Sequence, residues 1–178
     1  VRATGHVVAY DDVVYYIGGS DSDLKVHDTV FKYHISNNSY TFGTPLPVAR
    51  DRGQARIVTF PQNSTTGISG PAMVVVGGTD ESRNALTSIV AFPLECSDNC
   101  QWVDLTNLTI GRRSFEMEVY NNKLFIFGGV TGVGSDLVTT LEMYVYEYNF
   151  HFHLSVTTDV LLTSCCSCVR LAMILRMT

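Results

Sequence analysis

The chain has 178 residues, of which 46% are hydrophobic and 11% aromatic, a composition typical of globular proteins and not of disordered chains. Its formal net charge is −5 and it contains only 12 lysines and arginines, so it lacks the basic surface that nucleic-acid backbones require. We therefore expect no nucleic-acid partner.

The first expected strand is Gly5–Tyr10, a β-rich run closed by the turn Asp11-Asp12. The next segment, Val13–Gly19, reads VVYYIGG. It is apolar at five consecutive positions, which predicts a strand buried on both faces. Its final glycines allow a sharp turn where a Cβ would collide with a neighbouring element. Two further strands are expected over Thr29–Ile35 and Tyr40–Gly43.

The same pattern then occurs twice more. In the second copy the ten residues Pro61–Gly70 separate the first two strands, and insertions in repeats often form binding loops. The strands expected in these two copies are Gly53–Phe60, Ala72–Gly78, Thr87–Leu94, Gln101–Leu105, Phe115–Tyr120, Lys123–Gly129, Thr140–Glu147 and Phe150–Leu154. No useful length of residues 1–154 has helical periodicity.

Spacing supports a true repeat. The second glycines of the three pairs, Gly19, Gly78 and Gly129, are separated by 59 and then 51 residues. Repeats of roughly 50 residues are typical of propeller blades. Aromatic landmarks keep the same order: Tyr33, Phe92 and Tyr144 follow their glycine pairs by 14 or 15 residues, and each precedes another aromatic residue, namely Tyr40, Trp102, and Phe150 or Phe152. Arg2 and Arg112 each precede a glycine pair by 16 residues.

This pattern resembles the kelch repeat of β-propeller proteins, and the resemblance covers residues 2–152. It implies an all-β fold, an incomplete kelch-type β-propeller with three blades of four antiparallel strands. The expected repeats are about 2–47, 48–108 and 109–154, and residues 155–178 form an apolar, cysteine-rich tail outside the pattern. The residues that carry the repeat are Gly18, Gly19, Gly77, Gly78, Gly128, Gly129, Tyr33, Phe92, Tyr144 and Trp102. Phe92 stands where the motif has tyrosine, and only the second repeat has the motif's tryptophan.

Kelch propellers usually close with about six blades, and closure removes exposed sheet edges. Three blades cannot close. We therefore expect further blades outside this chain, and the missing initiator methionine at Val1 agrees with a longer polypeptide. The alternative is a partner that completes the ring. Alone, the three repeats are expected to be poorly stable and to self-associate through open edges.

The tail breaks the repeat pattern. Its apolar run over Val160–Met177 is interrupted by Arg170, so membrane insertion is expected to be marginal and no membrane partner is expected. The alternatives are an acylated anchor or a continuation unrelated to the fold. The last reading is the one we favour.

No pattern of catalytic residues is present. The sequence has no serine nucleophile elbow, no HExxH motif and no glycine-rich loop that leads into a helix. Gly129–Gly134 is interpreted as a flexible loop, because it lacks the helix N-terminus that binds phosphate. His151 and His153 would lie on one side of a strand, but no third metal ligand accompanies them. We expect neither a cofactor nor a metal.

The resemblance implies a non-enzymatic module that binds a protein partner of unknown identity through its inter-strand loops. Candidate contacts lie in the loops that follow the glycine pairs, with the insertion around Asn63 as the alternative. The candidate residues are Asp21, Asp23, Asp80, Arg83 and Asp136.

Two alternatives stay open. Candidate glycosylation sequons at Asn37, Asn63 and Asn107, with a candidate disulfide between Cys96 and Cys100, would suit an extracellular kelch protein in adhesion or matrix recognition. A cytoplasmic module with free thiols fits equally well, so the compartment stays open. A kelch-like copper oxidase fragment is the third reading, but no matching set of tyrosine, histidine and cysteine ligands is apparent.

Overall fold

The computed structural model describes residues 2–96, 99–132, 136–147 and 150–157, with the backbone alone from residue 145 onward. The described residues form twelve strands and no helix. In chain order the strands are β1 His6–Tyr10, β2 Val13–Ile17, β3 Val30–His34, β4 Ser39–Phe42, β5 Gln54–Phe60, β6 Gly70–Val76, β7 Ile89–Pro93, β8 Val103–Asp104, β9 Glu116–Tyr120, β10 Lys123–Phe127, β11 Thr140–Glu147 and β12 Phe150–Thr157.

These strands make three separate four-stranded sheets: β1 to β4 (blade 1), β5 to β8 (blade 2) and β9 to β12 (blade 3). Each strand pairs antiparallel with its sequence neighbour. The all-β class and the three blades of four strands are thus confirmed. β8 is shorter than expected because only Val103 and Asp104 pair with β7. β12 continues to Thr157, beyond the expected end at Leu154.

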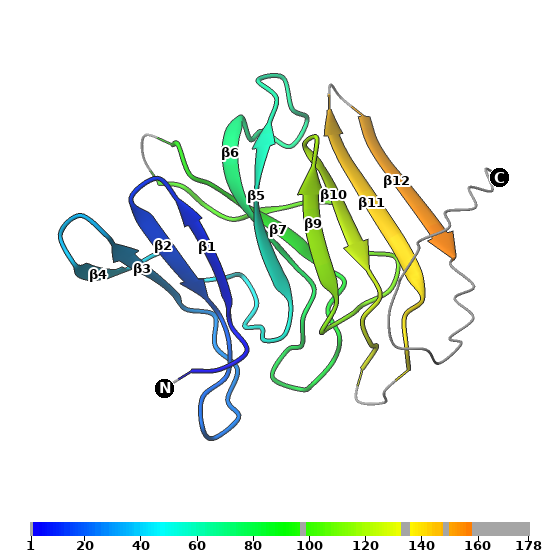
Figure 1. The fold of residues 1–178 in the computed structure, drawn as a ribbon, viewed down its shortest axis with the longest axis horizontal. Helices are drawn as coiled ribbons and strands as arrows, with labels where there is room; N and C mark the ends of the chain where they lie inside the picture. The colour runs from blue at the N-terminus through cyan, green and yellow to red at the C-terminus, as the bar shows by residue number, and fades with distance from the viewer. Residues whose placement is uncertain (1, 97–98, 133–135, 148–149, 158–178) are drawn as a thin grey trace, which may run out of the picture.

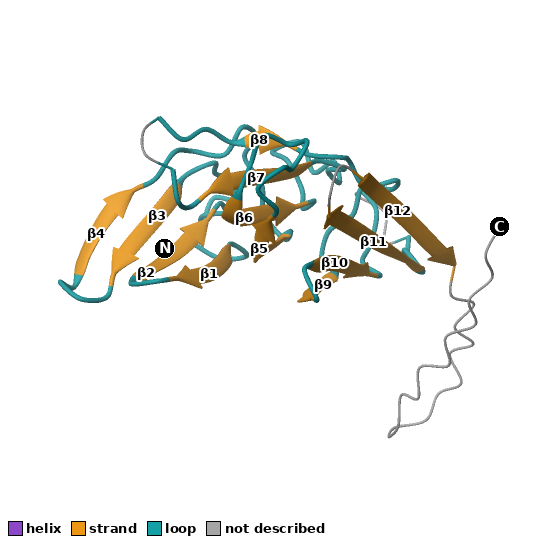
Figure 2. Cartoon of the chain, turned by 90° about the horizontal axis from the view of Figure 1, so that it is seen from above, coloured by secondary structure: helices purple, strands orange, loops and turns teal. Residues whose placement is uncertain are grey.

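The blades are arranged as an open arc, with β1, β5 and β9 on its inner side and β4, β8 and β12 on its outer side (Figure 2). One apolar cluster joins blades 1 and 2 and includes Ile17, Val30, Met73 and Val75. A second joins blades 2 and 3. Burial of these faces is the main contact between the blades, because none of the described strands pairs with a strand of another blade.

The expectation that β2 is buried on both faces was wrong. In β2 only Tyr15 and Ile17 are buried, whereas in β6 the whole run Ala72–Val76 is buried. The cause is position in the arc: blade 2 has a neighbour on each side, whereas blades 1 and 3 have one each among the described residues. A continuous apolar run therefore indicates a strand whose two faces can both pack against neighbouring blades. It does not show that both neighbours are present.

The glycine pairs end β2, β6 and β10, and all six glycines have positive φ, between 52° and 97°. A Cβ on Gly18 would lie 2.4 Å from Arg50 O, and one on Gly77 would lie 2.6 Å from Arg112 O, in both cases at the lead-in to the next blade. Gly128 is different, because its nearest atom would be Val138 O at 3.5 Å. The first glycine of every pair is therefore needed for its positive φ. Where another blade follows, it is also needed because a Cβ would collide with the lead-in to that blade.

Exchanging these glycines for alanine separates the two requirements. Gly77→Ala is expected to lower the free energy of unfolding by about 2–4 kcal/mol, because it adds a steric collision to left-handed strain. Gly128→Ala is expected to cost only about 1–2 kcal/mol, the strain alone. Urea denaturation of both variants gives the comparison. Equal losses would show that the approach of Arg112 O is not limiting.

Blade 1 has an open face, defined here as the side turned away from blade 2. Cross-strand registers place Val7, Val14, Tyr16, Phe31, Tyr33, Tyr40 and Phe42 on it. Tyr40 and Phe42 are 73% and 74% exposed. The equivalent face of blade 2 carries Phe92, which is buried against blade 1. The open face of blade 1 is therefore an apolar packing surface of the same kind, without a neighbour in the described residues.

We expect the chain to self-associate through this surface, since contiguous exposed apolar patches of this kind drive association. Replacing Tyr40 and Phe42 with lysine is expected to shift the chain toward monomer in size-exclusion chromatography with light scattering. Leu137→Lys, which charges an equally exposed side chain on blade 3, serves as the control. If all three proteins elute as the same oligomer, association uses another surface.

None of the described residues forms a helix long and apolar enough to span a membrane. Residues 158–178, on which the expectations about the tail rest, lie outside the described part of the chain.

Candidate functional site

The loops that follow the glycine pairs all lie at one end of the three blades (Figure 1). They meet the segments that lead into β1, β5 and β9 through isolated bridges, Ala3↔Ser20, Asp51↔Thr79 and Arg113↔Val130. We call this end the loop face. The opposite end carries the short turns within the blades and the β5–β6 insertion.

The bridges show which positions are equivalent in the three repeats. Ala3, Asp51 and Arg113 hold one position, and each is followed by a residue with positive φ. Those residues are Thr4, Arg52 and Ser114, with φ of 57°, 54° and 52°. Backbone hydrogen bonds join them across the blades, from Arg52 N to Thr4 O at 2.9 Å and from Ser114 N to Arg52 O at 2.8 Å. The loop face is thus a continuous strip with one backbone geometry and different side chains.

One set of arginines at this end supports the fold. Arg2, Arg50 and Arg112 each donate to the first glycine's carbonyl oxygen and to the residue that begins the third strand or precedes it. Arg50 and Arg112 are fully buried. Arg50 was missed in the sequence because the insertion places it 27 residues before Gly77, where the other two arginines stand 16 residues before their glycine.

A second set of arginines does not make this contact with a glycine carbonyl at the end of its own blade. Arg52, Arg83 and Arg113 surround a small cavity of about 150 Å³, together with Thr79 and Gly132. They come from three segments: the lead-in to β5, the β6–β7 loop and the lead-in to β9. Their equivalents in other repeats are Ser114, Leu24 and Ala3, so the fold does not need arginine at any of the three positions.

The cavity carries a positive charge inside an acidic protein. Asp51 is its only acidic neighbour identified by contact among the described residues, and it is fully buried. Its carboxylate accepts hydrogen bonds from the hydroxyls of Thr79 and Thr4, and lies 3.5 Å from Arg83 Nη1. Arg83 and Arg113 also donate to backbone oxygens of Leu24 and Gly132 at 2.9 and 3.3 Å. Arg52 has no side-chain partner in the described part of the chain.

A larger hollow of about 290 Å³ adjoins the cavity and shares Arg52 with it. It lies between the first residues of β1 and β5, and its polar lining comes from Thr4, His6, Gln54 and Ser114. Together the two hollows follow the inner ends of the blades, where the lead-in segments run side by side. This arrangement offers hydrogen-bond donors along a line as well as a concentrated positive charge at one end.

The predicted contact residues divide into two groups. Asp21 and Asp80 shape their own loops: Asp21 accepts from the amides of Asp23 and Lys25 at 3.0 Å, and Asp80 accepts from that of Asn84 at 2.8 Å. Hydrogen bonds from His27 and these amides lower the pKa of Asp21, with the His27 contribution the largest. Asp23 and Asp136 are exposed. Of the five predicted residues, Arg83 alone lines the cavity.

Arg52 and Arg113 were not among the candidates. Both lie directly before strands, in segments that the sequence shows only as the start of a repeat. A signal was nonetheless present: comparison of the three lead-ins, R-A-T-G, R-D-R-G and R-R-S-F, separates the first arginine, which recurs, from the later arginines, which do not. The convergence of three segments from the second and third repeats on one cavity has no signature in the sequence.

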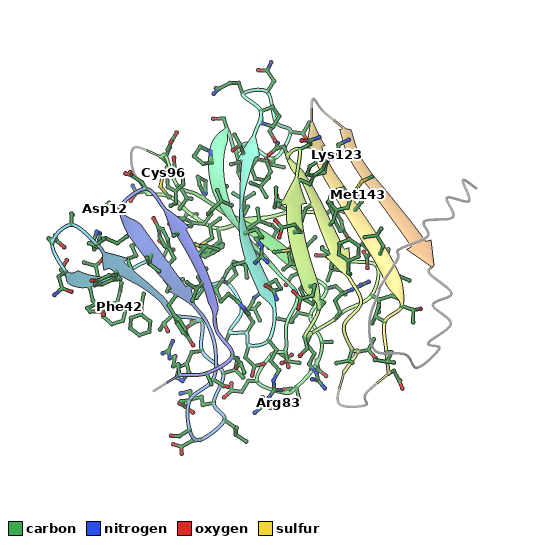
Figure 3. All side chains as sticks on the ribbon, in the orientation of Figure 1. Asp12, Phe42, Arg83, Cys96, Lys123 and Met143 are labelled. Atoms are coloured by element: carbon green, nitrogen blue, oxygen red, sulfur yellow. A yellow bond between two sulfur atoms is a disulfide. The ribbon has the colours of Figure 1, made fainter. Side chains whose placement is uncertain are left out.

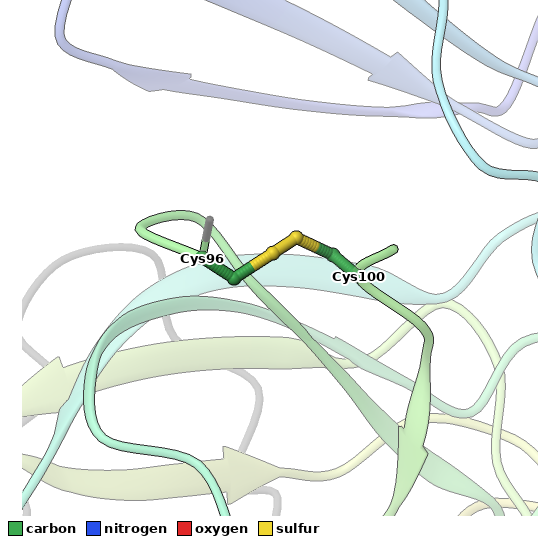
Figure 4. The surroundings of a disulfide bond; sticks show 2 residues. All are labelled: Cys96 and Cys100. Atoms are coloured by element: carbon green, nitrogen blue, oxygen red, sulfur yellow. A yellow bond between two sulfur atoms is a disulfide. The ribbon is translucent and has the colours of Figure 1, made fainter. Parts of the chain in front are cut away.

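The other candidate residues lie elsewhere. The predicted sequon residues Asn37, Asn63 and Asn107 are all exposed, in the β3–β4 turn, the β5–β6 insertion and the segment after β8. The structure joins Cys96 and Cys100 in a disulfide, with their Cα atoms 6.2 Å apart (Figure 4). Cys96 lies at the end opposite the loop face, far from Arg83 (Figure 3).

The aromatic repeat residues are packing residues. Phe92 and Trp102 contact each other with ring centroids 5.2 Å apart, and the Trp102 indole donates to Thr44 O at 3.1 Å in the lead-in from blade 1. Tyr144 is buried and its hydroxyl lies 3.1 Å from Asn107 O. Tyr33 is on the open face of blade 1, where its hydroxyl donates to Asn38. Phe92 keeps the packing of the motif's tyrosine but not its hydrogen bond.

No cluster of potential metal ligands occurs among the residues whose side chains are described. His151 and His153 belong to β12, and their side chains lie outside that part of the chain.

Comparison with known proteins agrees with the repeat pattern. A family model described as the kelch motif matches residues 2–47, which span blade 1 and its connection to blade 2. The resemblance to the kelch repeat is thus confirmed, and the family model locates the motif in the first repeat. No curated protein sequence matches the chain. Among solved structures, one titled "Structure of YjhT" superposes with a TM-score of 0.63 at 21% sequence identity. The match covers 86% of this chain and 45% of that one, so this kelch-repeat chain spans less than half of that protein's length.

The matched residues 2–47 include Arg2, Gly18 and Gly19, whose equivalents in blades 2 and 3 make the same contact between an arginine and a glycine carbonyl. The match therefore covers one copy of that contact. It does not account for Arg83, Arg52 or Arg113, because their counterparts in the matched repeat are Leu24, Thr4 and Ala3.

Proposed function

We propose that this kelch-type module is a non-enzymatic interaction domain that binds a protein partner through its loop face. The observation that carries the proposal is the loop face itself: the polar loops of three successive blades lie at one end, where the lead-in segments of the three blades and the loops of blades 2 and 3 line two adjoining hollows. Rigid strands position those loops, which is the usual arrangement of binding residues on a stable scaffold. The kelch family assignment supports an interaction module, although a fold alone does not fix function.

The opposite end is the natural comparison. Its turns β1–β2, β3–β4 and β9–β10 are tight, and in each of them residues with positive φ close the hairpin. Only the β5–β6 insertion offers a larger surface there. It is held internally by hydrogen bonds among Ser64, Thr66 and Ile68, the last of which is buried. A partner that used this end would meet little besides short turns.

Site-specific photocrosslinking tests the choice of end. A benzophenone amino acid is placed at Leu24 on the loop face, and in a second protein at Ile35 in the β3–β4 turn; the two side chains are 64% and 51% exposed. Both proteins are irradiated in extract, and adducts are identified by mass spectrometry. We expect one protein to be captured from Leu24 and not from Ile35, and excess unlabelled chain to suppress its capture. Saturable capture from Ile35 alone would overturn the proposal.

A second candidate function rests on a different observation. The Cys96–Cys100 disulfide lies with the exposed Asn63 and Asn37 away from the loop face, and disulfides persist in oxidising compartments. This favours an extracellular kelch protein that acts in adhesion or matrix recognition. Glycans at these positions would leave the loop face free, so the two proposals share one binding surface and differ in compartment.

The compartment is tested by intact mass after expression through the secretory pathway. If the chain is extracellular, we expect a mass decrease on glycosidase treatment and a gain of two hydrogens on reduction of one disulfide. An Asn63→Gln variant should lose one glycan. A chain that carries neither glycan nor disulfide when secreted would refute the extracellular reading and leave the intracellular one.

A further inference from the structure

We infer that the cavity lined by Arg52, Arg83 and Arg113 binds a carboxylate of an acidic peptide segment in the partner. This inference rests on the proposed function and specifies its ligand. The chain has a net charge of −5, yet three arginines converge here from separate segments. Like charges gathered around one cavity repel each other, so their placement is unfavourable unless an anion joins them.

The fold does not require these arginines. Structural arginines recur in all three repeats and bond to glycine carbonyls, whereas these three replace a serine or threonine, a leucine and an alanine at equivalent positions. Asp51 offsets one of the three charges, and two remain without an acidic partner among the described residues.

The chemistry of the lining fits a carboxylate. Guanidinium groups bind carboxylates through paired N–H donors, and such charge-assisted hydrogen bonds are stronger than neutral ones. Arg52 has no side-chain partner among the described residues, so its donors can face a ligand. Arg83 and Arg113 each donate to one backbone oxygen, which holds the side chain in place. Their remaining guanidinium N–H groups include donors that can reach a ligand.

Size and surroundings favour a peptide side chain over a free small molecule. The cavity holds about 150 Å³, well below the roughly 300–1,000 Å³ typical of small-molecule pockets. The adjoining hollow of about 290 Å³ shares Arg52, so an extended chain can place one acidic residue in the cavity and continue along Gln54 and Ser114. Exposed acidic residues at the loop tips, among them Asp23, Glu81 and Asp136, disfavour a long acidic run. The expected ligand therefore has one acidic anchor flanked by neutral residues.

The repeats supply the variants for the test. Arg52→Ser, Arg83→Leu and Arg113→Ala each install the residue that an equivalent repeat already holds in the same backbone conformation, so the fold should tolerate them. Lys123→Ser removes one positive charge at the opposite end and is the matched control (Figure 3). Melting temperatures identify any variant that unfolds. Arg113→Ala carries the test if Arg83→Leu does not fold, because the Arg113 side chain bonds only to Gly132 O among the described residues.

The probe is a phage-displayed library of random 12-residue peptides, selected on the full chain. The strongest sequence is then synthesised with a fluorescent label, both as selected and with its acidic residues changed to Asn or Gln. We expect a conserved Asp or Glu in the selected peptides. Affinity should fall at least about tenfold on neutralising that residue or any one of the three arginines, and should stay unchanged in Lys123→Ser.

The outcomes separate the inference from the function on which it rests. Peptides that bind without an acidic residue, or equally well to the arginine variants, would overturn the inference and leave a peptide-binding module. Failure to select any peptide would count against both. Inorganic phosphate is titrated in parallel: if phosphate at low millimolar concentration raises the melting temperature of the full chain and the peptides do not bind, the cavity takes a free anion and the inference is wrong.

Discussion

Replacing Arg112 with alanine is expected to lower the free energy of unfolding by about 3–5 kcal/mol, enough to unfold blade 3 or the whole chain. Arg112 and Glu142 are both fully buried and form an ion pair. Removing the arginine leaves the Glu142 carboxylate buried without its countercharge. It also leaves the carbonyl oxygens of Gly128 and Thr140 without the donors that now lie 3.0 and 3.1 Å away.

The pair is well satisfied as it stands. Glu142 accepts from the amide of Thr109 at 3.0 Å and from the hydroxyl of Tyr144 at 2.7 Å. Burial is the largest single influence on Glu142 and would raise its pKa. The hydrogen bonds from Tyr144 and Thr109, with the charge of Arg112, outweigh burial and hold that pKa below its ordinary value. The carboxylate is therefore ionised at neutral pH, and the loss of Arg112 exposes the full cost of burying it.

Two further variants make this prediction specific. Arg113→Ala removes the neighbouring arginine, which is only half-buried and whose side chain bonds to Gly132 O alone in the described part of the chain, and should cost less than about 1 kcal/mol. Arg112→Met combined with Glu142→Leu replaces the pair with apolar side chains of similar size and should recover part of the loss. All variants are compared by urea denaturation. Equal losses in Arg112→Ala and Arg113→Ala would show that the pair is not the origin of the effect.

The strands and blades were predictable from the sequence because each repeat encodes its own sheet. The runs VVYYI, AMVVV and KLFIF end at glycine pairs, and the periodic aromatic residues mark the outer strands. What the sequence did not reveal depends on neighbours. Val14 and Met73 occupy equivalent places in similar apolar runs, yet Met73 is buried while Val14 is only partly so, because only blade 2 lies between two others.

The candidate site was harder to predict for the same reason. Asp21 and Asp80 appeared to be surface contacts because they lie in polar loops, whereas their side chains close those loops on themselves. Arg52 and Arg113 looked like part of the repeat's opening. Their approach to Arg83 depends on how far one blade is rotated from the next, and no local pattern of residues encodes that rotation. The insertion of Pro61–Gly70 also displaced Arg50 from the common spacing.

Acidification from pH 6.5 to about 4 is expected to reduce the stability of the chain by about 3 kcal/mol through His6 alone. His6 lies on β1, facing blade 2, and is 7% exposed. Its Nε2 atom has no hydrogen-bond partner among the described residues. The pKa of His6 is lowered from 6.5 to about 4, mainly by burial and also by the charge of Arg50, while the charge of Asp51 acts in the opposite direction.

The direction of the effect follows from proton binding. Below pH 6.5 the unfolded chain protonates His6, whereas the folded chain does not do so until the pH approaches its own pKa of about 4. The unfolded state therefore binds the extra proton across this window, and the free energy of unfolding falls as the pH falls. Below pH 4 the two states bind equally and His6 contributes no further slope. Glu142 acts in a lower range, because its folded-state pKa lies below its ordinary value of 4.5 and its contribution is lost only as the pH falls below that value.

Urea denaturation at a series of pH values, with wild-type chain and His6→Leu, measures the contribution. The variant removes the titrating ring and keeps an apolar side chain against blade 2, so its stability should vary much less between pH 6.5 and 4. His34→Gln is the control, because His34 lies at the end of β3, is only partly buried, and bonds to Thr41 Oγ1 at 2.9 Å. The control should retain the wild-type pH dependence. If His6→Leu keeps the wild-type pH dependence, His6 is not its origin. The folded chain must then accept a protonated His6, which requires that the ring reach solvent or an acceptor between blades 1 and 2.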